Sequence, residues 1–187
     1  LEEIGKDEEH NAVIKERRNG QGAEVAGVTV EGKVAYLSLV QLQAGVTWQK
    51  SHYTRPEKWS KDSSVPAEKR IFRTPDWYGY FTATYSPVKP LNIALSGTYT
   101  GSMIVQHMKG YIPKDMAVTT PDFFDMNLKI SYDFSLYKFI TLQLNAGVQN
   151  IFNAYQRDFD PGKERDSGYI YGPSMPRSYF AGAKLMF

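Results

Sequence analysis

Histidines are the residues of this chain best suited to bind a transition metal or haem, because neutral imidazole is a common metal ligand. His10, His52 and His107 lie far apart in the sequence, and all three fall in segments predicted to be loops. Loops can converge, so a shared site is one interpretation. Scattered surface histidines are the commoner arrangement, and we therefore expect neither a metal site nor a cofactor.

A second group of side chains offers the carboxylate oxygens that calcium prefers. This acidic group consists of Asp158, Asp160, Glu164 and Asp166. The spacing of an EF-hand is absent, and Lys163 and Arg165 are interleaved with the acids. We interpret the segment as a solvated loop.

Catalytic motifs are absent. No G-x-S-x-G elbow presents a serine nucleophile, and none of the histidines lies in a clear strand. Gly20-Gln21-Gly22 precedes a predicted strand rather than a helix, so it does not match a phosphate-binding loop. We expect a protein that is not an enzyme. The chain has a formal net charge of only +2, and its 22 basic residues are scattered among 20 acidic ones. This distribution argues against a nucleic-acid partner.

Cationic and aromatic side chains are concentrated in two predicted loops, at about 58–72 and 155–171. Such loops could capture an anionic chelate or a ring-bearing ligand. They could equally be solvated surface, or bind anionic lipopolysaccharide. The candidate ligand contacts are Lys69, Arg70, Arg157, Arg165, Tyr169 and Tyr171.

The elements that must position these loops are strands. In 140–148 the even positions are apolar and the odd positions are polar or glycine, which is the period of a strand with one apolar and one polar face. Strands of roughly 9 to 14 residues, close to the 9–11 that cross a bilayer, are predicted at about 23–36, 40–48, 77–85, 91–100, 122–134, 140–148 and 178–187.

Composition agrees with strands that cross a membrane. The sequence is 42% hydrophobic and 22% charged, which excludes disorder, and it has no run of about 20 apolar residues that could form a membrane helix. Its 14% aromatic residues and 15 glycines, with alternate positions polar, suit a transmembrane β-barrel. The absence of cysteine excludes a disulfide scaffold.

Short and long connections alternate along the chain. Short turns are expected near 37–38, 86–90 and 135–138, and long polar loops near 51–76, 106–121 and 151–176. Outer-membrane barrels have this asymmetry, with periplasmic turns and extracellular loops. We therefore divide the chain into 1–22, an extracellular loop or the N-terminal edge of a fragment, and 23–187, an antiparallel up-and-down transmembrane barrel segment.

Aromatic residues gather at the ends of the predicted strands, where amphipathic rings favour the headgroup region of a membrane. Two girdles are predicted, although aromatics are also common in strands generally. The girdle residues are Tyr36, Trp48, Trp77, Tyr85, Tyr99, Phe124, Tyr132 and Phe134.

The end of the chain carries an ordered set of motifs: Asn145-Ala-Gly-Val-Gln-Asn-Ile-Phe-Asn153, then Tyr155, then Pro176-Arg177, and finally Lys184-Leu-Met-Phe187. This order resembles the C-terminal end of TonB-dependent outer-membrane receptors. The stretch 165–173 looks like receptors from Bacteroidota. Upstream, 22–31 and Arg73-Thr-Pro75 are similar to strands of the same family, so the resemblance covers about residues 20–187.

The resemblance implies a 22-stranded barrel in the outer membrane of a Gram-negative bacterium, of which this chain would form about the last seven strands. A plug domain with its TonB box would lie N-terminal to Leu1 and couple to the TonB complex. The receptor would import a scarce nutrient such as a ferric siderophore, haem, cobalamin or a glycan. Its partners would be outer-membrane lipid, the barrel-assembly machinery and a small-molecule ligand. Gly182, Leu185 and Phe187 match the signal that the assembly machinery reads, whereas Phe180 departs from it.

Two other interpretations stay open. Residues 12–18 could add an eighth strand and complete a small barrel with a structural or adhesive role, or the strands could form a soluble lipocalin-like or sandwich protein. The chain begins without Met or a signal peptide, and an open sheet would leave unpaired edges in lipid. We therefore interpret it as a fragment that does not transport by itself.

Overall fold

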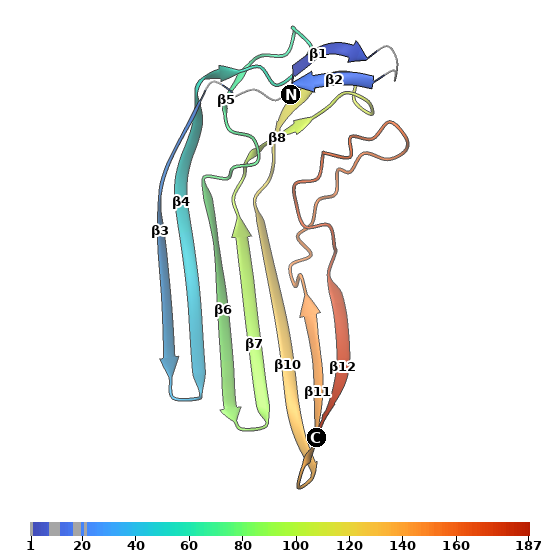
Figure 1. Cartoon of the computed structure of the whole chain (residues 1–187). Helices are drawn as coiled ribbons and strands as arrows, with labels where there is room; N and C mark the ends of the chain where they lie inside the picture. The colour runs from blue at the N-terminus through green and yellow to red at the C-terminus, as the bar shows by residue number, and fades with distance from the viewer. Residues whose placement is uncertain (1, 8–11, 17–19, 21) are drawn as a thin grey trace.

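One antiparallel sheet dominates the computed structural model, which describes residues 2–7, 12–16, 20 and 22–187. Seven strands follow one another as an up-and-down meander, with hairpin turns at one end and longer loops at the other (Figure 1). They are β3 (Ala23–Tyr36), β4 (Val40–Glu57), β6 (Trp77–Val88), β7 (Leu91–Thr100), β10 (Phe123–Tyr137), β11 (Ile140–Gln149) and β12 (Ser178–Met186). The all-β antiparallel fold class is confirmed.

In the described part of the chain, five short strands lie outside this meander; only the second of them falls in a segment, 12–18, that the sequence offered as a possible strand. They are β1 (Glu2–Asp7), β2 (Ala12–Glu16), β5 (Glu68–Arg70), β8 (Ile104–His107) and β9 (Met116–Thr119). β1 pairs with β2, β8 with β9, and β5 with the end of β4. β4 itself continues past Trp48 to Glu57, because its ladder to β3 extends to Tyr53 beyond the end of the apolar alternation. Among the described residues there is no helix with the length and hydropathy needed to cross a membrane.

Register places like residues side by side across the sheet. One row runs through Val34, Leu42, Ala83, Leu95, Leu128, Val148 and Tyr179. The neighbouring row on the opposite face runs through Lys33, Gln43, Thr82, Ser96 and Asn127. Because successive side chains of a strand point to opposite faces, the sheet has a continuous apolar face and a continuous polar face.

The apolar face is uncovered in the described part of the chain. Val30 is 63% exposed and Val34 is 67% exposed, whereas the buried apolar side chains, Ile104, Val105, Phe123 and Tyr169, lie at or above the loop end of the sheet. A soluble sandwich or lipocalin would cover such a face with a second layer or turn it inward. Apolar exposure on this scale calls for an apolar surrounding or a partner.

Aromatic side chains lie in two bands on the apolar face. Trp48, Trp77, Tyr99 and Phe124 lie toward the loop end, and Tyr36, Tyr85, Tyr132 and Phe134 lie toward the turn end. Phe124 and Phe134 are ten residues apart on β10, which is roughly 33 Å along a strand and about 25 Å along the membrane normal at a typical tilt. The bands thus have the separation of membrane girdles, and their contact with headgroups stays a prediction.

The sheet is open. β3 and β12 are its outer strands and do not pair with each other in the described part of the chain. Ala12–Glu16 pairs with Glu2–Asp7 rather than with β3. The eighth strand that a small closed barrel needs from 12–18 is therefore not part of the sheet over its described residues.

Candidate functional site

The polar face is hollowed near the loop end of β3, β4, β6 and β7. The hollow has a volume of about 440 Å³. We call it the tyrosine–threonine pocket, and its principal side chains are Thr29, Glu31, Tyr78, Tyr80, Thr98 and Thr100. Thr47, behind them, exchanges a hydroxyl hydrogen bond of 2.9 Å with Thr29. The pocket therefore offers hydroxyl groups, two phenol rings and one carboxylate.

A glycine shapes this pocket. Gly45 pairs with Glu31 on one side and with Tyr80 on the other. A Cβ at Gly45 would lie 2.8 Å from Cε1 of Tyr80 and 3.1 Å from Cγ of Glu31. Because glycine leaves this space empty, the Tyr80 hydroxyl reaches across β4 and donates to Oε1 of Glu31 at 3.1 Å. Gln43 Nε2 donates in turn to the Tyr80 hydroxyl at 3.2 Å.

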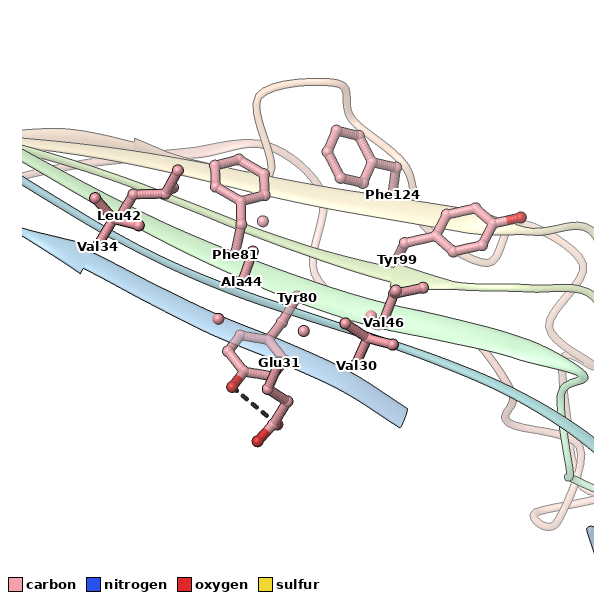
Figure 2. A pocket seen from close by; sticks show the side chains of 14 residues that line it. Val30, Glu31, Val34, Leu42, Ala44, Val46, Tyr80, Phe81, Tyr99 and Phe124 are labelled. Carbon is pink, nitrogen blue, oxygen red and sulfur yellow. Dashed lines mark hydrogen bonds between the residues drawn. The ribbon is translucent and has the colours of Figure 1, made fainter. Parts of the chain in front are cut away.

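The opposite side of the same strands has different chemistry. Figure 2 shows the Glu31–Tyr80 pair on one side and Leu42, Phe81 and Phe124 on the other. The hollow on that side, of about 560 Å³, is lined mainly by apolar side chains and glycines. Phe81 lies over Gly97, where a Cβ would collide with its ring. This face suits hydrocarbon, and the polar face suits water or a polar ligand.

Above the sheet, the β8–β9 hairpin packs against residues 150–177, and we call the two together the loop cap. His107 is only 8% exposed and stacks on Tyr169, with ring centroids 3.7 Å apart and planes 6° from parallel. Its Nε2 donates to Oδ2 of Asp160 at 2.8 Å. The expectation of surface histidines is therefore wrong for His107, because long-range contacts bury it.

The other histidines do not join His107. His52 lies on β4, where its Nε2 is 3.4 Å from Oε2 of Glu24, and His10 lies outside the described residues. The described part of the chain contains no group of three or more metal-binding side chains within reach of one ion.

Three members of the acidic group, Asp158, Asp160 and Asp166, are structural acceptors, which corrects their interpretation as part of a solvated loop. Glu164 is exposed, as that interpretation expected. Asp158 accepts from the hydroxyls of Tyr169 at 2.8 Å and Tyr171 at 2.6 Å. Asp166 accepts from the N–H of Met108 at 2.8 Å and so ties the loop to the hairpin. Burial alone would raise the pKa of Asp160, but hydrogen bonds from the Asp166 N–H and His107 outweigh it, and the pKa is lowered.

Hydrogen bonds between Asp158 and the hydroxyls of Tyr169 and Tyr171 shift the pKa of all three side chains. Desolvation opposes ionisation of Asp158, but the hydrogen bonds from Tyr171 and Tyr169 outweigh it and lower its pKa. Desolvation and the bond to Asp158 raise the pKa of Tyr169 to about 12, and they also raise the pKa of Tyr171. Each tyrosine stabilises the loop cap only while it is protonated, because only the protonated phenol can donate to the carboxylate.

We expect Tyr169 and Tyr171 to ionise in a late phase of an alkaline absorbance titration, at higher pH than an exposed tyrosine. Their stabilisation of the loop cap is complete below about pH 10 and is lost as the pH rises through about 12 for Tyr169. At the acid end, the contribution of Asp158 is present above about pH 3.9 and is lost as the pH falls through its lowered pKa. The double variant Tyr169→Phe/Tyr171→Phe should lack the late phase, and an unchanged late phase would contradict the assignment.

Arg73 joins two loops that are far apart in the sequence. Its backbone N–H donates to the Ile104 carbonyl at 2.8 Å, and its Nη1 donates to the Ile170 carbonyl at 2.7 Å. Its Nη2 donates to the Gly168 carbonyl. A planar guanidinium can reach two carbonyls at once, which a lysine ammonium on a flexible stem does less well.

Arg73→Lys should therefore loosen residues 168–170 by about 1–2 kcal/mol of local opening free energy, measured by hydrogen exchange. Arg157→Lys is the matched control, because Arg157 is exposed and its Cζ lies 5.1 Å from the ring centroid of Tyr155 in the same loop. Equal exchange in the two variants would show that Arg73 does not hold the loops together.

The candidate ligand contacts do not gather in one pocket. Arg70 pairs with Glu68 within β5 at 3.5 Å, and Arg165 donates to the Gly162 carbonyl at 3.3 Å. Lys69 is exposed, whereas Tyr169 is 4% exposed. Their role in binding stays a prediction. Sequence reasoning missed Glu31, Gly45 and Tyr80, for which the available signal was a tyrosine at a polar position of β6.

The assembly residues lie at the C-terminal edge of the sheet. Gly182 and Leu185 lie within β12, and Phe187 directly follows its last residue. Phe180 lies on the polar face beside Gly147, its partner in β11, where a Cβ would collide with the Phe180 ring. Packing over this glycine accounts for an aromatic residue where the assembly signal has a polar one. Recognition by the assembly machinery stays a prediction.

Comparison with known proteins identifies the fold. No family model and no curated protein matches the sequence. The closed form of the ferric-catecholate import receptor Fiu from E. coli K12 matches 88% of this chain with a TM-score of 0.60 and 21% identity. FpvAI, in its complex with pyocin S2, matches 88% with a TM-score of 0.58 and 15% identity. The chain covers 21% and 19% of the length of these proteins. Both are TonB-dependent receptors, and nothing in the comparison supports an origin in Bacteroidota.

Proposed function

We propose that this chain forms the C-terminal strands of a TonB-dependent receptor in the outer membrane of a Gram-negative bacterium. The role is import of a scarce nutrient, such as a ferric siderophore, haem, cobalamin or a glycan, and not catalysis. The strands provide barrel wall, and the loop cap provides part of the outer vestibule. The observation that carries the proposal is a single sheet with one continuous apolar face and one continuous polar face, capped by ordered loops.

The two faces explain how the segment serves such a receptor. Backbone polar groups cannot stay unpaired in hydrocarbon, so the edges of β3 and β12 pair with further strands of the same barrel. The apolar face then meets lipid between the aromatic bands, and the polar face lines the lumen. A plug domain outside this chain, within that lumen, couples the receptor to the TonB complex. One of the structural matches, Fiu, is an import receptor for ferric catecholate, which supports import as the activity.

A cellular test separates transport from other roles. In the source bacterium, deletion of the gene that encodes this chain should abolish growth on one limiting nutrient, and deletion of tonB should have the same effect. The protein should fractionate with the outer membrane and migrate faster in a detergent gel when unheated, as folded barrels do. A soluble protein, or growth that does not depend on tonB, would overturn the proposal.

The alternative, a complete small barrel with a structural or adhesive role, makes a different prediction about size. Sequencing of the mature polypeptide from native outer membrane, with its mass, distinguishes the two. A product several times the length of this chain supports the receptor. A product of about this length would remove active transport and require the edges of the sheet to close differently.

A further inference from the structure

The tyrosine–threonine pocket lies on the polar face of the sheet, which the proposed function turns toward the lumen. Its volume of about 440 Å³ is within the range of small-molecule sites, about 300–1,000 Å³. Gly45 keeps its floor open, since a side chain there would push Tyr80 away from Glu31. The rings of Tyr78 and Tyr80 are partly exposed, at 39% and 37%, so a ligand can contact them.

We propose that this pocket binds a neutral saccharide. Glu31 accepts hydrogen bonds from sugar hydroxyls, and the rings of Tyr78 and Tyr80 pack against the apolar C–H face of the sugar. The inference rests on the proposed function, because that function makes the polar face a lumen wall. It narrows the imported nutrient to a glycan among the ligand classes named above.

Charge separates a saccharide from an anionic chelate. No lysine or arginine lines the pocket. The nearest base on the same face of β3 is Lys33, and no ion pair joins it to Glu31 within the described residues. In the same row, Thr98 pairs with Asp125, which adds a second carboxylate beside the pocket. An anionic ligand would meet negative charge there, with no base in the pocket lining to compensate it.

The balance of donors and acceptors separates a saccharide from a cation. Hydroxyl groups of threonine and tyrosine both donate and accept hydrogen bonds, whereas an ammonium or guanidinium group only donates. A cation could satisfy Glu31 but would leave the hydrogens of Tyr78, Thr98 and Thr100 without acceptors. Sugar hydroxyls have the same dual character, so they can satisfy the carboxylate and the hydroxyls together.

The test uses the full-length protein, purified in detergent, on an array of neutral and acidic oligosaccharides, with the ferric complex of 2,3-dihydroxybenzoate as an anionic probe. We expect a neutral oligosaccharide to bind. Glu31→Gln keeps the size of the side chain and its acceptor for Tyr80 but removes the charge, and it should weaken that binding about ten-fold. Gly45→Ala should weaken it as well, by displacing Tyr80.

Thr82→Val is the matched control. Thr82 lies on β6 in the next row of the polar face, beside Gln43 and Ser96, and does not line the pocket. This variant should bind the neutral oligosaccharide as the unmodified protein does. If Glu31→Gln and Thr82→Val had the same affinity, the sugar would bind elsewhere, or another part of the protein would cover the pocket, and the inference would fail.

Two further results of the binding experiment would contradict the saccharide assignment. Absence of binding to every neutral oligosaccharide, or binding of the ferric complex that Gly45→Ala weakens, would overturn the saccharide assignment. The proposed function has its own readout, which is growth that depends on tonB. Growth of that kind without saccharide binding would refute only this inference, whereas loss of tonB dependence would refute the receptor itself.

Discussion

Gly147→Ala should destabilise the C-terminal strands by about 3 kcal/mol, at the upper end of ordinary overpacking. Gly147 lies near the end of β11, between Lys129 of β10 and Phe180 of β12. A Cβ there would collide with the Leu128 carbonyl and with the Phe180 ring, so both neighbouring strands would have to move. The Leu128 carbonyl belongs to the backbone of β10, so it cannot move aside as a side chain could. The measurement is the urea midpoint of the full-length protein, with the fraction that assembles in the membrane.

The chain contains a matched control for this substitution. Gly32 also lies within a strand, β3, but a Cβ there would meet no atom within 4 Å. Gly32→Ala should therefore be neutral or slightly stabilising, since alanine loses less backbone entropy on folding than glycine. Equal midpoints for Gly147→Ala and Gly32→Ala would show that the contacts around Gly147 do not limit the fold.

A second substitution tests whether the collision with the Phe180 ring causes the loss of stability in Gly147→Ala. Phe180→Ser removes the ring but leaves the Leu128 carbonyl, so Gly147→Ala/Phe180→Ser should recover part of the loss and not all of it. The two residues are in contact, so their effects should not add. Strict additivity would place the strain elsewhere.

Asn150→Ala should release the final loop from the sheet and lower the free energy of loop opening by about 4 kcal/mol. Three lost hydrogen bonds contribute roughly 1 kcal/mol each, and an alanine with a left-handed backbone costs about 1 kcal/mol more. Asn150 is 4% exposed and has a φ of 51°. Its Nδ2 donates to the carbonyls of Ala154 at 3.1 Å and Met175 at 3.0 Å, and its Oδ1 accepts from the Ala154 N–H at 2.8 Å. One side chain thus joins both ends of the loop.

Hydrogen exchange of residues 151–177 measures this release, and two variants separate its causes. Asn150→Gly tolerates the positive φ but lacks the hydrogen bonds, so it should recover only the backbone share. Asn145→Ala, within β11, removes an asparagine whose side chain makes no hydrogen bond to the described residues, and it should leave the loop protected. Protection in Asn150→Ala equal to that in Asn145→Ala would contradict this role.

The structure also gives a physical reason for the motif from Asn145 to Asn153. Asn150 and Asn153 both have positive φ, a conformation that asparagine tolerates better than most residues. Oδ1 of Asn153 accepts from the N–H of Arg177 at 2.9 Å, close to the start of β12. The two asparagines therefore form the turn that follows β11, and Asn153 also binds the backbone just before β12.

The sequence by itself determined the strands and their two faces. Alternation with period two is local information, and in 140–148 or 91–100 no other regular structure puts all the apolar residues on one side. The turns of the meander were equally local, because they need only a few residues between strands. What local pattern could not show was where a ladder stops, so β4 was predicted to end too early.

Tertiary structure alone decided the loop cap and the tyrosine–threonine pocket. His107 and Asp160 are 53 positions apart, and Glu31 and Tyr80 are 49 apart. Each pair meets only because the meander brings their segments together, the first above the sheet and the second across Gly45. Register and loop packing depend on interactions summed over many strands, whereas alternation depends on each strand alone. That difference is why the sheet could be predicted from the sequence, whereas the loop cap and the pocket could not.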